Sequence, residues 1–116
     1  RGIILSVSAP FHCSLMKTAA ENMRKKIEDT NFLKPKPNVI SNVTAQEETN
    51  VNRIKPLLID QITRRVRWRE SVNYMIKQGV EDFLEIGPSK VLSGLVKKIN
   101  GNVKVSNINS IEDIKE

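Results

Sequence analysis

The stretch "DFLEIGPSKVLSGLVKKI", residues 82–99, decides the fold. Its first part, "DFLEIG", is a short apolar run that predicts a strand, and the Gly-Pro pair that ends it predicts a turn. The remainder repeats apolar residues at three- and four-residue steps, which predicts a helix with one buried side. That side carries Val91, Leu92, Leu95, Val96 and Ile99. "VKVSNI", residues 103–108, predicts one more short strand after this helix.

Strands and helices are expected to alternate along the rest of the chain. We expect strands at Gly2–Val7 and Asn38–Val43, helices at about Cys13–Asp29, Asn52–Thr63 and Arg69–Gln78, and a short terminal helix capped by Ser110 and Asp113. Residues 44–50 are expected to form a loop. Pro56 is expected to lie in the first turn of its helix or to start the helix anew, since only there does its missing N–H do no harm. The order β-α-β-α-α-β-α-β-α favours an α/β fold with a mostly parallel sheet.

Length and composition exclude several classes of protein. The 116 residues suffice for one small domain, and no apolar run approaches the roughly 18–20 residues that span a bilayer. A single cysteine excludes an internal disulfide framework and suits a reducing compartment, so we expect a cytoplasmic protein. With one histidine besides, the chain lacks the ligands of a typical zinc site. The net charge of +6 permits acidic proteins, nucleotides or nucleic acid as partners, without choosing among them.

The only histidine and the only cysteine, His12 and Cys13, are adjacent in "SAPFHCSLM". His12 follows a predicted strand, and ligands of α/β proteins gather at the carboxyl ends of strands. An imidazole there can take and return a proton near neutral pH, although it could equally cap a helix or pack in a loop. Neighbouring side chains at the start of a helix diverge, so Cys13 is interpreted as a small packing residue and not as a partner of His12.

Two other stretches suggest binding sites, and each has a simpler structural interpretation. The turn in "EIGPSKVL" leads into a helix N-terminus that could hold an anion, but it lacks the glycine spacing of a phosphate loop and is expected to be structural. "RRVRWR", residues 64–69, resembles a nucleic-acid patch, yet Val66 and Trp68 alternate with the arginines as in a loop that packs on a core. A solvated basic loop is the expected outcome.

Four stretches taken together carry a family resemblance. "SVSAPFHCSLM", "VISNVTA", "LLIDQITRRVRWRESVNYM" and "FLEIGPSKVLSGLVKKI" occur in this order. Over about Ile3 to Val105, the chain resembles the C-terminal part of the malonyl-CoA:acyl carrier protein transacylase family, an acyltransferase family of fatty-acid synthesis whose fold also occurs in polyketide synthases. Each stretch alone is a weak motif, and the four in order are fairly specific.

The resemblance implies a two-step transfer through a malonyl-serine ester, from malonyl-CoA to the phosphopantetheine thiol of acyl carrier protein. It implies that His12 is the general base and that the backbone carbonyl of Gln61 orients its imidazole, so that the Gln61 side chain should be more replaceable. It implies that Phe11 shapes the acyl pocket and favours malonyl over methylmalonyl. Malonyl-CoA would be a substrate, and no cofactor, nucleic acid or membrane is expected.

The sequence departs from the family in one large respect, because it contains no GxSxG elbow. The family's serine, oxyanion hole and carboxylate-binding arginine all belong upstream, so we expect a fragment that is inactive alone and needs the N-terminal part of the same protein. The resemblance implies that residues 1–12 end a ferredoxin-like subdomain and lead to the histidine. Residues 13–116 would then form the C-terminal part of an α/β-hydrolase-like core.

Two other hypotheses remain open at this level. The chain could be a non-catalytic basic module that docks acidic acyl carrier protein, in which case binding would weaken as salt rises. It could also be a small basic nucleic-acid binder, which a gel-shift at physiological salt would detect.

Overall fold

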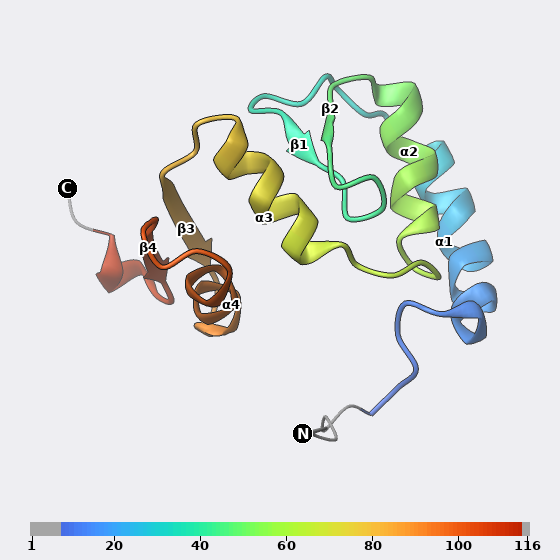
Figure 1. The fold of residues 1–116 in the computed structure, drawn as a ribbon. Helices are drawn as coiled ribbons and strands as arrows, with labels where there is room; N and C mark the ends of the chain where they lie inside the picture. Colours follow the sequence, from blue (N-terminus) through green and yellow to red (C-terminus); the bar gives the residue numbers. More distant parts are fainter. Residues whose placement is uncertain (1–7, 115–116) are drawn as a thin grey trace. The chain divides into compact units, whose positions relative to one another are not determined.

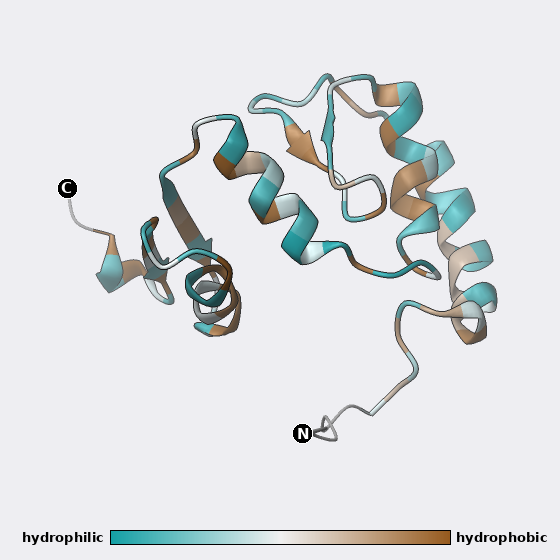
Figure 2. Ribbon diagram, in the orientation of Figure 1, coloured by the Kyte–Doolittle hydropathy of each residue, from teal (hydrophilic) through white to brown (hydrophobic). Residues whose placement is uncertain are grey.

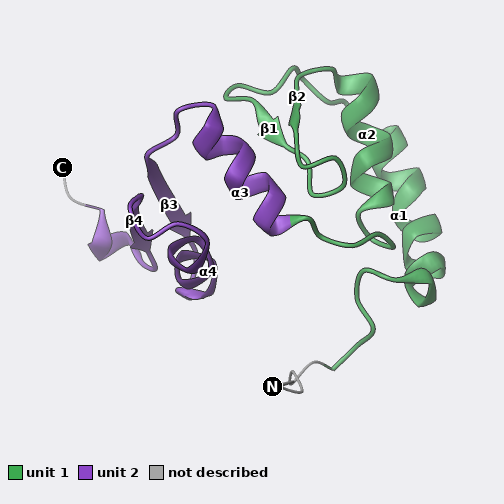
Figure 3. Cartoon of the chain, viewed as in Figure 1, with its two compact units in different colours: residues 1–67 green, residues 68–116 purple. Residues whose placement is uncertain are grey.

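The structure, a computed structural model, describes residues 8–114 (Figure 1). The strand predicted at Gly2–Val7 lies outside these residues. The chain divides after Arg67 into two compact units, which are coloured separately in Figure 3. Each unit is described by itself below.

The first unit contains two helices and a short hairpin. A 3-10 turn at Ser14–Met16 leads into α1, Lys17–Asp29, and α2 spans Val51–Asp60. The two helices pack through Ala20, Ile27 and Ile59, because α1 repeats its small and apolar residues at helical spacing. Asn50 begins α2 as its N-cap, where its side chain accepts a hydrogen bond of 2.9 Å from the Asn52 N–H.

The hairpin of this unit corrects the predicted loop at residues 44–50. Strand β1, Val39–Ile40, pairs antiparallel with β2, Glu47–Glu48, in the register Val39↔Glu48. The strand predicted at Asn38–Val43 is therefore shorter, and residues 41–46 turn the chain back on itself. Because "QEET" is polar, its composition indicated a loop, whereas local pairing across the turn makes it a strand.

Pro56 also departs from the prediction, because it is the sixth residue of α2 and not part of its first turn. A proline at this position cannot donate to the carbonyl of Asn52, four residues earlier. Asn52 and Pro56 are both exposed, so water can satisfy the carbonyl that the proline leaves without a helical donor.

The second unit is built around a parallel strand pair. Strand β3, Asp82–Ile86, and strand β4, Lys104–Ile108, pair in parallel and are connected through α4, Val91–Ile99. Helix α3, Trp68–Lys77, precedes β3, and a 3-10 turn at Ile111–Asp113 follows β4 with the predicted Ser110 and Asp113 capping box. This βαβ unit confirms the mixed α/β character inferred from residues 82–108.

Apolar side chains converge on one core in the second unit. Val72, Val96 and Val103 are buried there, and Val72 has no exposed surface. Hydrophobic and hydrophilic residues alternate around α2 and α4 in Figure 2, as expected of helices with one buried face. Among the described strands, the two pairs form separate sheets, so the single mostly parallel sheet that the alternation predicted is not found within residues 8–114. None of the helices within this range has the length and apolar character needed to cross a membrane.

Candidate active site

The segment that carries His12 is irregular and tightly turned. The Phe11 N–H donates to the Ala9 carbonyl at 2.9 Å, and the 3-10 turn begins directly after Cys13. His12 itself has φ +57°, in the left-handed region that non-glycine residues seldom occupy. This backbone conformation directs the exposed imidazole toward the end of α2.

His12 and Gln61 meet across 49 residues of sequence. The Nδ1 atom of His12 lies 2.8 Å from the backbone oxygen of Gln61, the residue that caps the C-terminus of α2. A carbonyl oxygen can only accept, so Nδ1 carries the proton and donates it. The other ring nitrogen, Nε2, is then left with a lone pair and can accept a proton from a substrate or nucleophile.

Cys13 does not take part in this arrangement. Its half-buried thiol donates to the Pro10 carbonyl, with Sγ 3.1 Å from the oxygen. The neighbouring side chains of His12 and Cys13 thus have different partners. Phe11, just before the histidine, has 58% of its surface exposed, so its ring is open to contact by another group.

One polar contact behind the histidine was not found from the sequence. The Asn42 side chain donates through Nδ2 to the Gln61 side-chain oxygen Oε1 at 3.1 Å, and the Asn42 carbonyl accepts from the Arg67 N–H at 3.1 Å. Asn42 stands in a polar turn, where an asparagine by itself carries no signal. Its partner lies 19 residues further along, with no periodicity linking the two positions.

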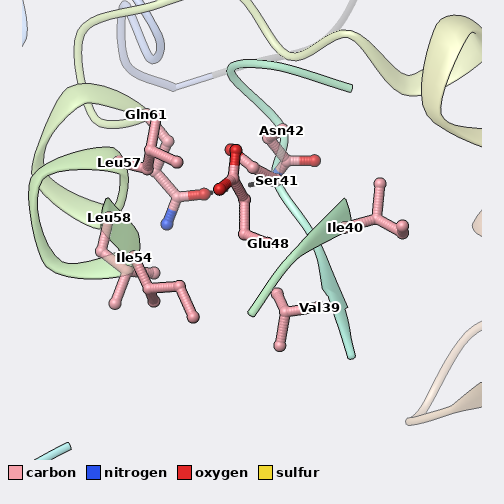
Figure 4. Close-up of a pocket in the computed structure, with 9 residues that line it drawn as sticks. All are labelled: Val39, Ile40, Ser41, Asn42, Glu48, Ile54, Leu57, Leu58 and Gln61. Carbon is pink, nitrogen blue, oxygen red and sulfur yellow. Dashed lines mark hydrogen bonds between the residues drawn. The ribbon is translucent and has the colours of Figure 1, made fainter. Parts of the chain in front are cut away.

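A pocket of about 210 Å³ lies beside this contact, between the hairpin and α2 (Figure 4). Asn42, Gln61 and the carboxylate of Glu48 all line it. Glu48 is buried and fully engaged, because it accepts two hydrogen bonds from Arg53 and one from the Thr44 hydroxyl. The pocket therefore combines an apolar wall from α2 with polar groups that already have partners.

The turn in "EIGPSKVL" is structural, as the sequence predicted. The Glu85 carboxylate accepts from the backbone N–H groups of Leu92 and Ser93 and from the Ser93 hydroxyl. The Ser93 hydroxyl, followed by these backbone donors, holds the pKa of Glu85 below its ordinary value. The first N–H groups of α4 thus already hold a carboxylate of the same chain, which disfavours a second anion.

Two arginines of the basic stretch at residues 64–69 have partners within the first unit. Arg64 forms an exposed ion pair with Asp60 at 3.6 Å, and Arg67 donates to the Thr44 carbonyl at 3.0 Å. Within the part of the chain that the structure describes, no three His, Cys, Asp or Glu side chains gather where they could hold a metal ion. The His12–Gln61 contact is therefore the arrangement with the clearest chemical capacity.

Comparisons with known proteins place this chain among acyltransferases, although no family model matches it. It is 46% identical over 114 residues to the malonyl CoA-acyl carrier protein transacylase of Bacillus subtilis, covering 98% of this chain and 36% of that protein. The crystal structure of acyl-carrier-protein-S-malonyltransferase from Bartonella henselae matches 97% of this chain and 36% of its own, with a TM-score of 0.89 and 40% identity.

A third match is a type II polyketide-synthase acyl-carrier protein in complex with its malonyl-transacylase. The match has a TM-score of 0.85 and 38% identity, and the aligned region covers 93% of this chain and 35% of the matched chain. The chain thus spans about a third of the length of the curated relatives that it matches. Nearly the whole chain therefore aligns, in sequence and in fold, with one portion of these enzymes. The chain belongs to the malonyl-CoA:acyl carrier protein transacylase family and corresponds to a C-terminal part of its members.

Proposed function

We propose that this chain supplies the general base of an enzyme that transfers malonyl from malonyl-CoA to the phosphopantetheine thiol of acyl carrier protein. His12 is the base, and the Gln61 carbonyl orients it. The observation that carries the proposal is the 2.8 Å contact between His12 Nδ1 and the Gln61 oxygen, because it leaves Nε2 free to take a proton. Family membership supplies the reaction.

In the first half of the reaction, Nε2 takes the proton of the serine hydroxyl as the serine oxygen attacks the thioester carbonyl. The carbon–sulfur bond breaks, and the imidazolium returns the proton to the departing CoA sulfur. In the second half, the carrier-protein thiol gives its proton to Nε2, and its sulfur attacks the carbonyl carbon of the malonyl-serine ester. The bond between this carbon and the serine oxygen breaks as the new thioester forms, and the imidazolium returns the proton to the serine oxygen. The Gln61 carbonyl accepts from Nδ1–H throughout and stabilises the imidazolium.

The serine belongs to the GxSxG elbow of the family, a motif that this sequence lacks. We therefore propose that the chain works together with the part of its relatives that it does not span. In this proposal, residues 1–12 end a ferredoxin-like subdomain, and residues 13–116 belong to an α/β-hydrolase-like core. The exposed ring of Phe11, next to the base, forms the side of the acyl pocket that excludes an α-methyl group.

Acyl carrier protein is the proposed partner, and the cytoplasm is the proposed location. The net charge of +6 suits an acidic carrier, because complementary charge speeds encounter and fixes orientation. A solved relative bound to its acyl-carrier protein supports this choice of partner.

The test uses a chimera in which this chain replaces the matching segment of the Bacillus subtilis relative. We expect the chimera to transfer malonyl to acyl carrier protein, and the chain alone to transfer none. His12→Ala in the chimera should lower the rate by about 10²- to 10⁴-fold, the usual contribution of a general base. Asn73→Ala, at an exposed position of α3, is the control and should retain the rate. Near-wild-type transfer by the His12→Ala chimera would refute the role of His12.

A further inference from the structure

Asn42 holds both ends of the segment that begins with Gln61. Its side-chain Nδ2 donates to Gln61 Oε1 at 3.1 Å, and its backbone oxygen accepts from the N–H of Arg67 at 3.1 Å. One residue of the hairpin turn thus ties the first and last residues of segment 61–67. Any displacement of Asn42 would be transmitted to Gln61, whose carbonyl contacts His12.

The turn that carries Asn42 is itself well fixed. The Ala45 N–H donates to the Ser41 carbonyl at 2.8 Å, and the Ser41 N–H donates to the Gln46 carbonyl at 3.0 Å. The Ser41 hydroxyl also accepts from the Val43 N–H at 3.1 Å, which closes the turn from inside. Asn42 therefore belongs to a turn that several hydrogen bonds hold in place, and it can act as an anchor for Gln61.

The Gln61 side chain is only half-buried. Gln61 caps the C-terminus of α2, where carbonyls lack the partner that continues a helix. Its side chain borders the pocket of about 210 Å³, so there is open volume into which it could rotate (Figure 4). The bond from Asn42 opposes that rotation and tethers the residue whose backbone carbonyl contacts His12.

We propose that Asn42 is a positioning residue for the general base and acts through the side chain of Gln61. The relay has two contacts. The Asn42 side chain binds the side-chain amide of Gln61, and the backbone carbonyl of Gln61 binds His12 Nδ1, which sets the direction of Nε2. Asn42 itself does not touch the reacting atoms. This inference rests on the function proposed above, and it gives the Gln61 side chain a specific task where the sequence predicted a replaceable one.

The test is a double-mutant cycle in the chimera, with Asn42→Ala, Gln61→Ala and the two combined. Asn42→Ala should lower kcat about fivefold, the rate equivalent of one ordinary hydrogen bond, and leave KM for malonyl-CoA unchanged. In the Gln61→Ala background, the same substitution should change kcat by less than about 1.5-fold, since the relay is already broken. Ile27→Val is the stability-matched control, because it loosens the α1–α2 core of the same unit without touching the relay.

Several results would overturn the proposal. An unchanged kcat in Asn42→Ala, a rise in KM alone, or the same fold-loss in both backgrounds would each do so. An equal loss of kcat in Ile27→Val at equal loss of thermal stability would reduce Asn42 to a structural role. Should Asn42→Ala fail to fold, Asn42→Ser replaces it in the cycle, because a serine side chain at this position is too short to reach Gln61. Failure of the function itself is distinguished by the His12→Ala chimera, which would then still transfer malonyl.

Discussion

The backbone of His12 is strained, and this strain can be measured by comparing two substitutions at one site. His12 has φ +57°. His12→Ala and His12→Gly both remove the imidazole and its contact with Gln61, so the lost side-chain interactions cancel in the comparison. What remains is the cost of a Cβ atom in the left-handed region, set against the greater flexibility of glycine in the unfolded chain.

The expected difference follows from these two contributions. A residue with a Cβ pays about 1–2 kcal/mol in the left-handed region, and glycine loses about 0.4–1 kcal/mol more on folding through its unfolded state. The balance is about 0.8 kcal/mol, with His12→Gly the more stable variant. Strain retained at a residue with a chemical task is a known feature of functional sites.

The assay is urea unfolding of the chain, followed by circular dichroism, with the slope checked for constancy between variants. The matched control compares Lys25→Ala with Lys25→Gly, at an exposed position inside α1. At a right-handed helical position alanine should be more stable than glycine, by about 0.8–1.0 kcal/mol, so the sign reverses between the two sites. Equal stability of the two His12 variants, or greater stability of His12→Ala, would refute the strain at this residue.

Two further predictions concern selectivity and pH. Phe11→Ser in the chimera should reduce the preference for malonyl-CoA over methylmalonyl-CoA by about tenfold in kcat/KM, the scale on which a pocket senses one methyl group; an unchanged ratio would remove Phe11 from the acyl pocket. Because hydrogen bonds from Ser93 and Leu92 lower the pKa of Glu85 below its ordinary value of 4.5, they stabilise the fold above about that pH, and this contribution is lost as pH falls through the lowered pKa. Unfolding midpoints measured down to about pH 2 should therefore fall less steeply for Glu85→Gln than for the unsubstituted chain, and parallel curves would contradict this account.

The parts of the fold that follow from local chemistry were predictable. Residues 82–108 change from a strand pattern to a helical repeat and back, and the structure has β3, α4 and β4 there. The pairing of β1 with β2 was not predictable, since "QEET" has no apolar alternation and its strand exists only through its partner. Pro56 inside α2 depends on the exposure of Asn52, which sequence spacing does not report.

The candidate active site was likewise predictable only in part. The position of His12 in the sequence did not decide whether its role was that of a general base or of a helix cap. Its pairing with Gln61 was implied by family resemblance, not by any periodicity. Asn42 remained unrecognised because its bond to Gln61 depends on the geometry of the turn at residues 41–46. Polar contacts between irregular segments are set by three-dimensional placement, and a single sequence carries little trace of them.

The central claim, that Gln61 holds the imidazole of His12 with Nε2 free to accept a proton, can be tested by ¹⁵N NMR of the ring nitrogens. His12 is the only histidine of the chain, so an untagged sample gives one pair of ring signals. At about pH 8.5, where imidazoles are ordinarily neutral, the account predicts a protonated Nδ1 and an unprotonated Nε2. A spectrum dominated by the opposite tautomer, with the proton on Nε2, would contradict it.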